Sequence, residues 1–304
     1  MAHKPLHPLK AKEARRNALF IVPMACLAVL LVALPLIYVG GMALTTADGG
    51  FTLNHFRGIL RADYLMVFFN SLKLAFYTTV ISLLIGYPFG YFMARSGRRW
   101  KALLMLLVII PFWTSALVRI YGWKILLQGN GPINTVLKNL GLIEKNIKFL
   151  GSYGSVLLAM VYCLISMMIL PCHSSVDKMD FTLVEAARDL GSRPWRAFVD
   201  VTLPLTMPGI LAGCVLVFVP SVGIFYLADI MGGGLVLVGN LIRDQLLKVR
   251  DWHMGSAMSM VTALGKTCLP QYFSPVCWLG QVAIFICLRS FICIGAKSAK
   301  QHCI

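Results

Sequence analysis

The chain has 304 residues, of which 58% are hydrophobic and only 13% are charged, whereas an ordinary globular domain carries about 25% charged residues. A soluble fold this apolar could not cover its own surface, so the long apolar runs predict an integral membrane protein. The net charge of +16 fits basic cytoplasmic loops better than nucleic-acid binding, because no basic stretch is interleaved with aromatic residues.

Several apolar runs come close to the roughly 20 helical residues that are needed to cross a bilayer. They cover residues 18–44, 69–94, 102–121, 153–171 and 208–228, and a sixth begins near Met254. Gly86-xxx-Gly90 and Gly209-xxx-Gly213 give two of these runs small-residue faces for close helix packing. The pattern predicts an all-α bundle of about six transmembrane helices.

The charges of the connections predict the side of the membrane that each one faces. Residues 1–17 hold five Lys and Arg against one Glu, and segment 95–101, two crossings later, holds four basic residues. Since Lys and Arg collect in cytoplasmic loops, we expect both segments in the cytosol. Connections 45–68 and 122–152 are then external, and 172–207 is cytoplasmic. Apolar residues at helical spacing in the second external connection predict a short interfacial helix there.

No motif for nucleotide binding, metal binding or catalysis has the spacing that it needs. Gly265-Lys266-Thr267 resembles the end of a phosphate-binding loop, but the position five residues before Gly265 is Met260 instead of the required glycine. The nine cysteines fit no zinc template and include no CxxC pair. We therefore expect no catalytic residue, no metal site and no ATP site in this chain.

The polar segment 174–207 lies between two apolar runs. Thr182 can cap a helix, with Glu185 as its capping-box partner three residues later. Gly191 lets the chain turn where a side chain would clash, and Leu203-Pro204 should end a second short helix. The first helix has an apolar face made of Leu183, Ala186, Ala187 and Leu190. Two helices this short need a partner to pack against.

This segment resembles the EAA loop of binding-protein-dependent ABC importer permeases, whose pattern is Glu-Ala-Ala, three residues, Gly, nine residues and Ile-x-Leu-Pro. Glu185-Ala186-Ala187, Gly191 and Leu203-Pro204 match at this spacing, with Val201 in place of isoleucine. In that family the loop docks into a groove of a separate ATPase subunit. The resemblance implies that Glu185 and Gly191 shape the docked helix, that Ala186 and Ala187 allow close approach, and that Leu203 and Pro204 anchor the loop.

The likeness extends over about residues 17–260. Three stretches resemble the spermidine/putrescine permease subfamily: "PFWTSALVRIYGWKILLQGNGPIN" (111–134), "PLTMPGILAGC" (204–214) and "FYLADIMGGG" (225–234). The resemblance is strongest to the first of the two permease subunits in a bacterial polyamine importer. It implies an inner-membrane location and three kinds of partner: a second permease subunit, two copies of an ATPase subunit that binds ATP and Mg, and a periplasmic binding protein.

A polyamine is a multivalent cation, and its route needs carboxylates or aromatic faces. Asp229, at the outer end of the fifth predicted span, is the candidate carboxylate, and Tyr226 and Phe225 precede it by three and four residues. Trp113 and Tyr121 are further aromatic candidates. The alternatives are a helix-end carboxylate with no role in transport and an interfacial aromatic belt, which we favour for Trp123.

Two other functions remain open at this point. A permease of the same type could carry ferric iron, sulfate or another small solute. A stand-alone channel or secondary transporter would work without ATP, but it fits the EAA spacing poorly and no inverted repeat is evident.

The predicted permease domain covers residues 18–260, after the basic N-terminus 1–17, and residues 261–304 form an atypical ending. Five of the nine cysteines fall in the last 37 residues of the chain, and no acidic residue follows Asp251. One interpretation is a frameshift near residues 262–266. The other is a poor sixth helix that residues 276–288 complete.

Overall fold

In the computed structural model, the described residues are 23, 26–27, 29–31, 33–46, 50–52, 54–141, 143 and 146–272, with only the backbone of Asn54 and of residues 267–272. The predicted basic N-terminus and most of the atypical ending lie outside them, as does part of the first predicted span. One isolated antiparallel bridge joins Thr45 and Phe51, and the regular structure of the described residues is otherwise helical.

The chain divides into two units. The smaller one consists of residues 1–61 and 242–263, and the larger one of residues 62–241 and 264–304. The smaller unit contains the helix Val29–Leu44, the short helix α2 (Asn54–Ile59) and most of α13 (Trp252–Tyr272). In it, the His55 and His253 rings stack with 5.7 Å between their centroids.

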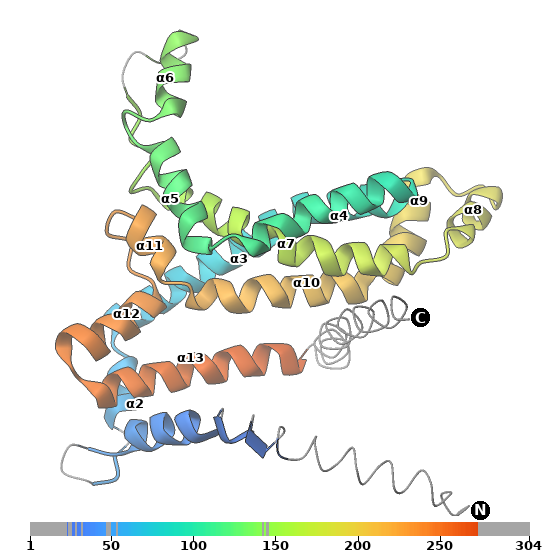
Figure 1. The fold of residues 1–304 in the computed structure, drawn as a ribbon. Coiled ribbons are helices and arrows are strands. Elements are labelled where there is room, and N and C mark those ends of the chain that lie inside the picture. Colours follow the sequence, from blue (N-terminus) through green and yellow to red (C-terminus); the bar gives the residue numbers. More distant parts are fainter. Residues whose placement is uncertain are drawn as a thin grey trace, which may run out of the picture. The chain divides into compact units, whose positions relative to one another are not determined.

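Three long helices form the core of the larger unit: α3 (Ala62–Arg95), α7 (Tyr153–Asp177) and α10 (Leu203–Gly223), which lie side by side (Figure 1). A Cβ atom at Gly90 would lie 3.1 Å from the backbone nitrogen of His173, and one at Gly209 would lie 2.6 Å from the carbonyl oxygen of Pro171. The glycine pairs that the sequence singled out therefore lie where α3 and α10 approach the α7 backbone.

The all-α transmembrane fold that the sequence predicted is confirmed. Within the described residues, α3, α7 and the continuous helix Pro194–Gly223 are long and apolar enough to cross a membrane. A fourth span is present if the bent pair Arg98–Trp113 and Ala116–Asn139 counts as one. The predicted number of about six spans is not confirmed by this part of the chain.

The third predicted span, 102–121, is not one straight helix. α4 (Arg98–Trp113) ends before Thr114, and the helices on the two sides of the break are bent by 94°. At the break, the Thr114 hydroxyl donates a hydrogen bond to the Pro111 carbonyl oxygen at 3.0 Å, and the backbone of Thr114 is extended. α5 (Ala116–Leu127) begins two residues later.

The fourth and fifth predicted spans also end at other residues. α7 continues six residues past Pro171, because a proline inside a membrane helix is tolerated where neighbours satisfy the freed backbone groups. α10 ends at Gly223, where the extended backbone of Ile224 breaks the helix, and α11 (Tyr226–Met231) is a separate short helix. Asp229 therefore lies on a separate short helix beyond the fifth span, and not at the outer end of that span as predicted.

The short helix that the sequence predicted in connection 122–152 is α6 (Pro132–Asn139), which extends away from the three core helices (Figure 1). Asn134, only 1% exposed, holds it in place. The Asn134 amide donates to the carbonyl oxygens of Gly129 and Ile147, at 3.0 Å each, and its oxygen accepts from the Ile147 nitrogen. Val136 and Leu140 stay exposed, whereas Ile133 packs against the main hydrophobic cluster, so the apolar face of α6 is only partly covered on this chain.

Candidate functional site

The first helix of the polar segment is α8 (Thr182–Asp189), and its first turn is capped by Asp180. The backbone nitrogen of Thr182 donates to Asp180 Oδ1 at 3.0 Å, and this hydrogen bond lowers the pKa of the Asp180 carboxyl. The predicted capping box is wrong, because Thr182 is already the first helical residue and the Glu185 nitrogen donates to the Phe181 carbonyl oxygen instead of to the Thr182 side chain. An aspartate two residues before a helix is a common turn signal and could have indicated this cap.

α8 ends in a left-handed turn at Gly191, whose φ is +84°. The Ser192 nitrogen donates to the Ala187 carbonyl at 3.1 Å, and the Gly191 nitrogen donates to the Arg188 carbonyl at 2.9 Å. This pair of bonds defines a Schellman motif. A Cβ atom at Gly191 would meet nothing within 4 Å, so the predicted clash is wrong. Glycine suits this position because of its backbone angle.

The two faces of α8 differ in burial. On the inner face, Val184 is buried together with Met179 and Ala197, and Ala187 packs beside them. On the outer face, Leu183 is 48% exposed and Leu190 is 88% exposed, with Ala186 and Glu185 also exposed. The predicted apolar face is thus divided, because Ala187 points inward. Leu183, Ala186 and Leu190 form an exposed stripe, which we call the α8 stripe.

The second helix does not end at Leu203-Pro204, as the sequence predicted. α9 (Pro194–Ala197), a π-helical turn (Phe198–Thr202) and α10 form one helix, Pro194–Gly223. In an α-helix, Pro204 would lack a bond to the Asp200 carbonyl and its ring would clash with that oxygen. The wider π turn, in which the Leu203 nitrogen bonds to the Phe198 carbonyl, accommodates the proline. The polar segment is therefore continuous with a membrane span.

Three of the five residues predicted for a cation pathway lie together. Asp229 and Tyr226 are on α11, and Phe225 immediately precedes it, with 6.1 Å between the two aromatic rings. Asp229 Oδ1 accepts a hydrogen bond of 2.5 Å from Asn240 Nδ2. Asn240, on α12 (Val238–Asp244), is 4% exposed. Sequence reasoning missed Asn240, because no pattern in its neighbourhood marks it.

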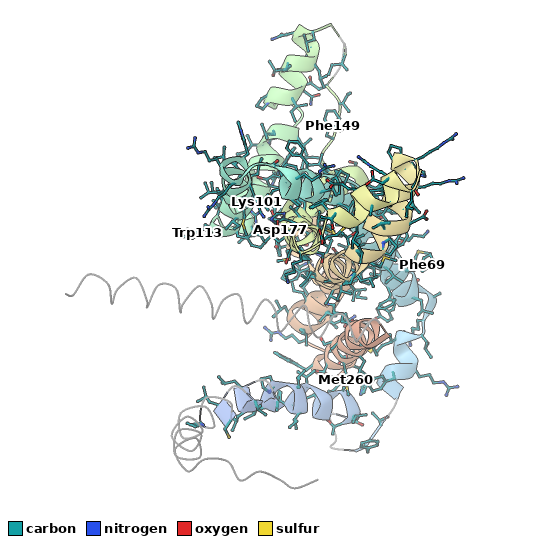
Figure 2. All side chains as sticks on the ribbon, turned by 90° about the vertical axis from the view of Figure 1, so that its right-hand side faces the viewer. Phe69, Lys101, Trp113, Phe149, Asp177 and Met260 are labelled. Carbon is teal, nitrogen blue, oxygen red and sulfur yellow. The ribbon has the colours of Figure 1, made fainter. Side chains whose placement is uncertain are left out.

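The other two pathway candidates lie on the surface of this chain. Trp113, at the end of α4, is 89% exposed and points away from the helices (Figure 2), and Tyr121 on α5 is 51% exposed. Trp123, which the sequence assigned to the interfacial belt, packs edge to face on Tyr162 of α7 with 5.5 Å between ring centroids. The guanidinium of Arg119 lies 6.0 Å from the centre of the same Tyr162 ring.

An ion pair joins Lys101 on α4 to Asp177 at the end of α7 (Figure 2). The pair brings connection 95–101 next to the start of connection 172–207. Both connections therefore lie at the same end of the helices, which is the arrangement that the charge pattern predicted.

Comparison with known proteins gives a consistent picture. Residues 86–269 match the family model for the binding-protein-dependent transport system inner membrane component. The spermidine/putrescine transport system permease protein PotB of Haemophilus influenzae is 42% identical over 236 residues, which cover 75% of this chain and 82% of that protein.

Among solved structures, the chain resembles a bacterial ABC transporter involved in the import of the acidic polysaccharide alginate. The TM-score is 0.68 at 15% identity, over 90% of this chain and 99% of the other. The alginate transporter in complex with an alginate pentasaccharide-bound periplasmic protein gives a TM-score of 0.66 at 16% identity, over 88% and 96% of the two chains. At such identities the likeness describes the fold alone.

Proposed function

This chain belongs to the family of binding-protein-dependent transport system inner membrane components, and from that membership we propose that it is a permease subunit of an ABC importer for polyamines. It is a multi-pass inner-membrane protein and a transport subunit. The observation that carries the substrate is the 42% identity, over 75% of this chain, to a permease named for spermidine and putrescine.

In this proposal, the α8 stripe docks into a separate ATPase subunit, which binds ATP and Mg²⁺ and is present in two copies. The stripe combines two exposed leucines with Ala186, whose small side chain allows close approach. Glu185 lies exposed beside it and can pair with a basic group of the partner. The Asp180 cap and the Gly191 turn fix the two ends of the helix, so little order has to be gained on docking.

The continuous helix Pro194–Gly223 supports this mechanism, because a push on the polar segment is carried along the backbone into a membrane span. Leu203 and Pro204, at the end of the π turn, then connect the docked segment to the span. A second permease subunit would complete the pathway, and a periplasmic binding protein would deliver the solute. We propose that the N-terminus and connection 172–207 face the cytosol.

For the substrate route we propose Asp229, with Tyr226 and Phe225 beside it. A carboxylate next to two aromatic rings suits an organic cation, which gains from both kinds of contact. Trp113 and Tyr121, exposed on this chain, suit a surface toward lipid or toward the second permease subunit better than a route inside the chain.

Uptake in membrane vesicles that contain both permeases, the ATPase and the binding protein tests the proposal. We expect ATP-dependent uptake of radiolabelled putrescine and spermidine, but not of sulfate or ferric iron. Uptake of sulfate or iron in place of polyamines would show that the substrate is wrong. Polyamine uptake without ATP would instead indicate a channel or secondary transporter.

A further inference from the structure

Aromatic rings from three segments meet where the polar segment joins the membrane helices. Phe198, in the π turn, packs edge to face on Tyr87 and Tyr91 of α3, with 6.0 and 6.2 Å between ring centroids. Tyr91 also packs on Phe181, the residue before α8, at 6.5 Å. We call these four rings the aromatic joint. Both ends of the α8–α9 region thus contact the same helix, α3.

Further contacts hold the aromatic joint in one arrangement. The Tyr87 hydroxyl lies 3.0 Å from Thr206 Oγ1 on α10, and both residues are buried. The guanidinium of Arg95, in the last turn of α3, lies 5.9 Å from the centre of the Tyr91 ring and 5.6 Å from that of Phe181. Aromatic pairs with a cation above them have a defined geometry, unlike contacts between flexible aliphatic side chains.

The joint also reaches the exposed surface of the polar segment. Trp195 on α9 stacks on Phe198 with 6.0 Å between ring centroids and an angle of 28° between the ring planes. Trp195 is itself 73% exposed. A partner that covers the α8–α9 region could therefore contact a ring that is connected, through Phe198, to α3.

We infer that the aromatic joint transmits movement of the polar segment to α3, so that docking on the ATPase moves two membrane helices together. α10 follows through the continuous backbone, and α3 follows through Phe198 and Phe181. This inference rests on the proposed function. Its physical basis is that closely packed rings have a few discrete arrangements and resist gradual deformation. Phe198, Phe181 and Tyr91 are positioning residues in this account and do not contact the solute.

The first test compares two substitutions at Phe198 in the reconstituted full importer. Phe198→Leu keeps apolar bulk but removes the ring, and Phe198→Tyr keeps the ring. Phe92→Leu, at a 64% exposed position on α3, is the matched control. We expect Phe198→Leu to lower the polyamine uptake per ATP hydrolysed about tenfold, a typical size for coupling between sites. Phe198→Tyr and Phe92→Leu should keep the wild-type ratio, and all three should still copurify with the ATPase.

Two results would overturn the inference. One is an unchanged ratio in Phe198→Leu, which includes an equal loss of uptake and ATP hydrolysis. The other is loss of the ATPase from Phe198→Leu preparations, which would mean that the rings only support the fold.

A second test does not depend on the solute. Spin labels at Asp189→Cys on α8 and Phe92→Cys on α3, in a background without native cysteines, report the distance between the two helices. With the ATPase bound and the wild-type joint, we expect the distance between the two labels to be the same with and without ATP. In Phe198→Leu, we expect this distance to change when ATP is added. A distance that changes with ATP in the wild-type joint would overturn the inference. Failure of the wild-type importer to take up polyamines would contradict the proposed function alone.

Discussion

Tyr87 on α3 and Thr206 on α10 share a hydrogen bond of 3.0 Å between their hydroxyl groups, although 119 positions separate them in the sequence. Thr206 Oγ1 also lies 2.9 Å from the Thr202 carbonyl oxygen, to which it donates. Thr206 can therefore donate to the backbone and accept from Tyr87 at the same time. The bond connects two spanning helices next to the π turn, where the proposed movement enters the membrane.

Tyr87→Phe should lower the free energy of unfolding by about 1 kcal/mol, the usual net contribution of one internal hydrogen bond. The loss should be no larger, because the Thr206 hydroxyl keeps its bond to the Thr202 carbonyl and the ring packing of residue 87 is retained. Thermal unfolding in detergent measures the difference. Tyr77→Phe, at a 48% exposed position of the same helix, is the control. Equal melting temperatures for the two variants would contradict the prediction.

Gly191→Ala should weaken binding of the ATPase about fivefold, since a side chain in the left-handed region costs roughly 1 kcal/mol. The cause would be the φ of +84°, because no atom lies within 4 Å of the added Cβ. Gly191→Asn should bind better than Gly191→Ala, because asparagine tolerates this conformation. Gly97→Ala, at a glycine with φ of −60° and equal free space, is the control for binding measured by ATPase copurification. If alanine and asparagine at position 191 weakened binding equally, crowding in the complex would be the better explanation.

The parts of the fold that could be predicted depend on local pattern. Apolar composition predicted the membrane class and placed the start of α7 at Tyr153, where the structure has it. The spacing of Glu185 and Gly191 predicted a short helix followed by a turn, because a helix and a glycine turn each have a short-range signature. The break after Trp113 was not predicted, because Thr114 and Ser115 are too few to divide the apolar residues around them into two separate runs.

What could not be predicted depends on contacts between distant segments. The pairing of Phe198 with Tyr91, and of Asp229 with Asn240, requires knowledge of how helices pack. The prediction that the second short helix ends at Leu203-Pro204 was also wrong. A proline normally indicates a helix boundary, but a preceding π turn removes the clash and lets the helix continue.

Reversing the charge of either Lys101 or Asp177 should destabilise the protein slightly. The double reversal, Lys101→Asp with Asp177→Lys, should recover most of the lost stability. The side chains are 30% and 41% exposed, so solvent screens the pair and its coupling energy should be about 0.5 kcal/mol. A double-mutant cycle from melting temperatures at low salt measures it. Arg98→Asp, one turn earlier on α4, is the control and should gain nothing from Asp177→Lys. Strictly additive single effects would argue against the ion pair.

The N-terminal turn of α8 should lose protection in acid. The Thr182 nitrogen bonds to the ionised Asp180 carboxyl, whose pKa is lower in the folded protein than in the unfolded chain. The stabilisation is therefore complete above the unfolded pKa of about 3.9 and is lost as the pH falls through the lower folded value. Hydrogen exchange of a peptide that spans residues 178–190, corrected for intrinsic rates, should show weaker protection at low pH. Asp180→Asn caps without titrating and should remove this pH dependence, whereas an unchanged dependence would mean that another group is responsible.

Asp229→Asn tests the substrate route most directly. The substitution removes the negative charge but keeps the shape, and the amide oxygen at position 229 can still accept the hydrogen bond from Asn240 Nδ2. Loss of one partly screened charge contact should raise the KM for putrescine and spermidine about tenfold. Asp63→Asn removes another exposed carboxylate, at the start of α3, and should leave the KM unchanged. A structural role of Asp229 would change the melting temperature or the ATPase copurification. In the substrate role, Asp229→Asn should leave both unaltered and change only the KM for uptake. Equal KM values for the two variants would mean that Asp229 is an ordinary helix-end carboxylate, and the route would then have to lie elsewhere.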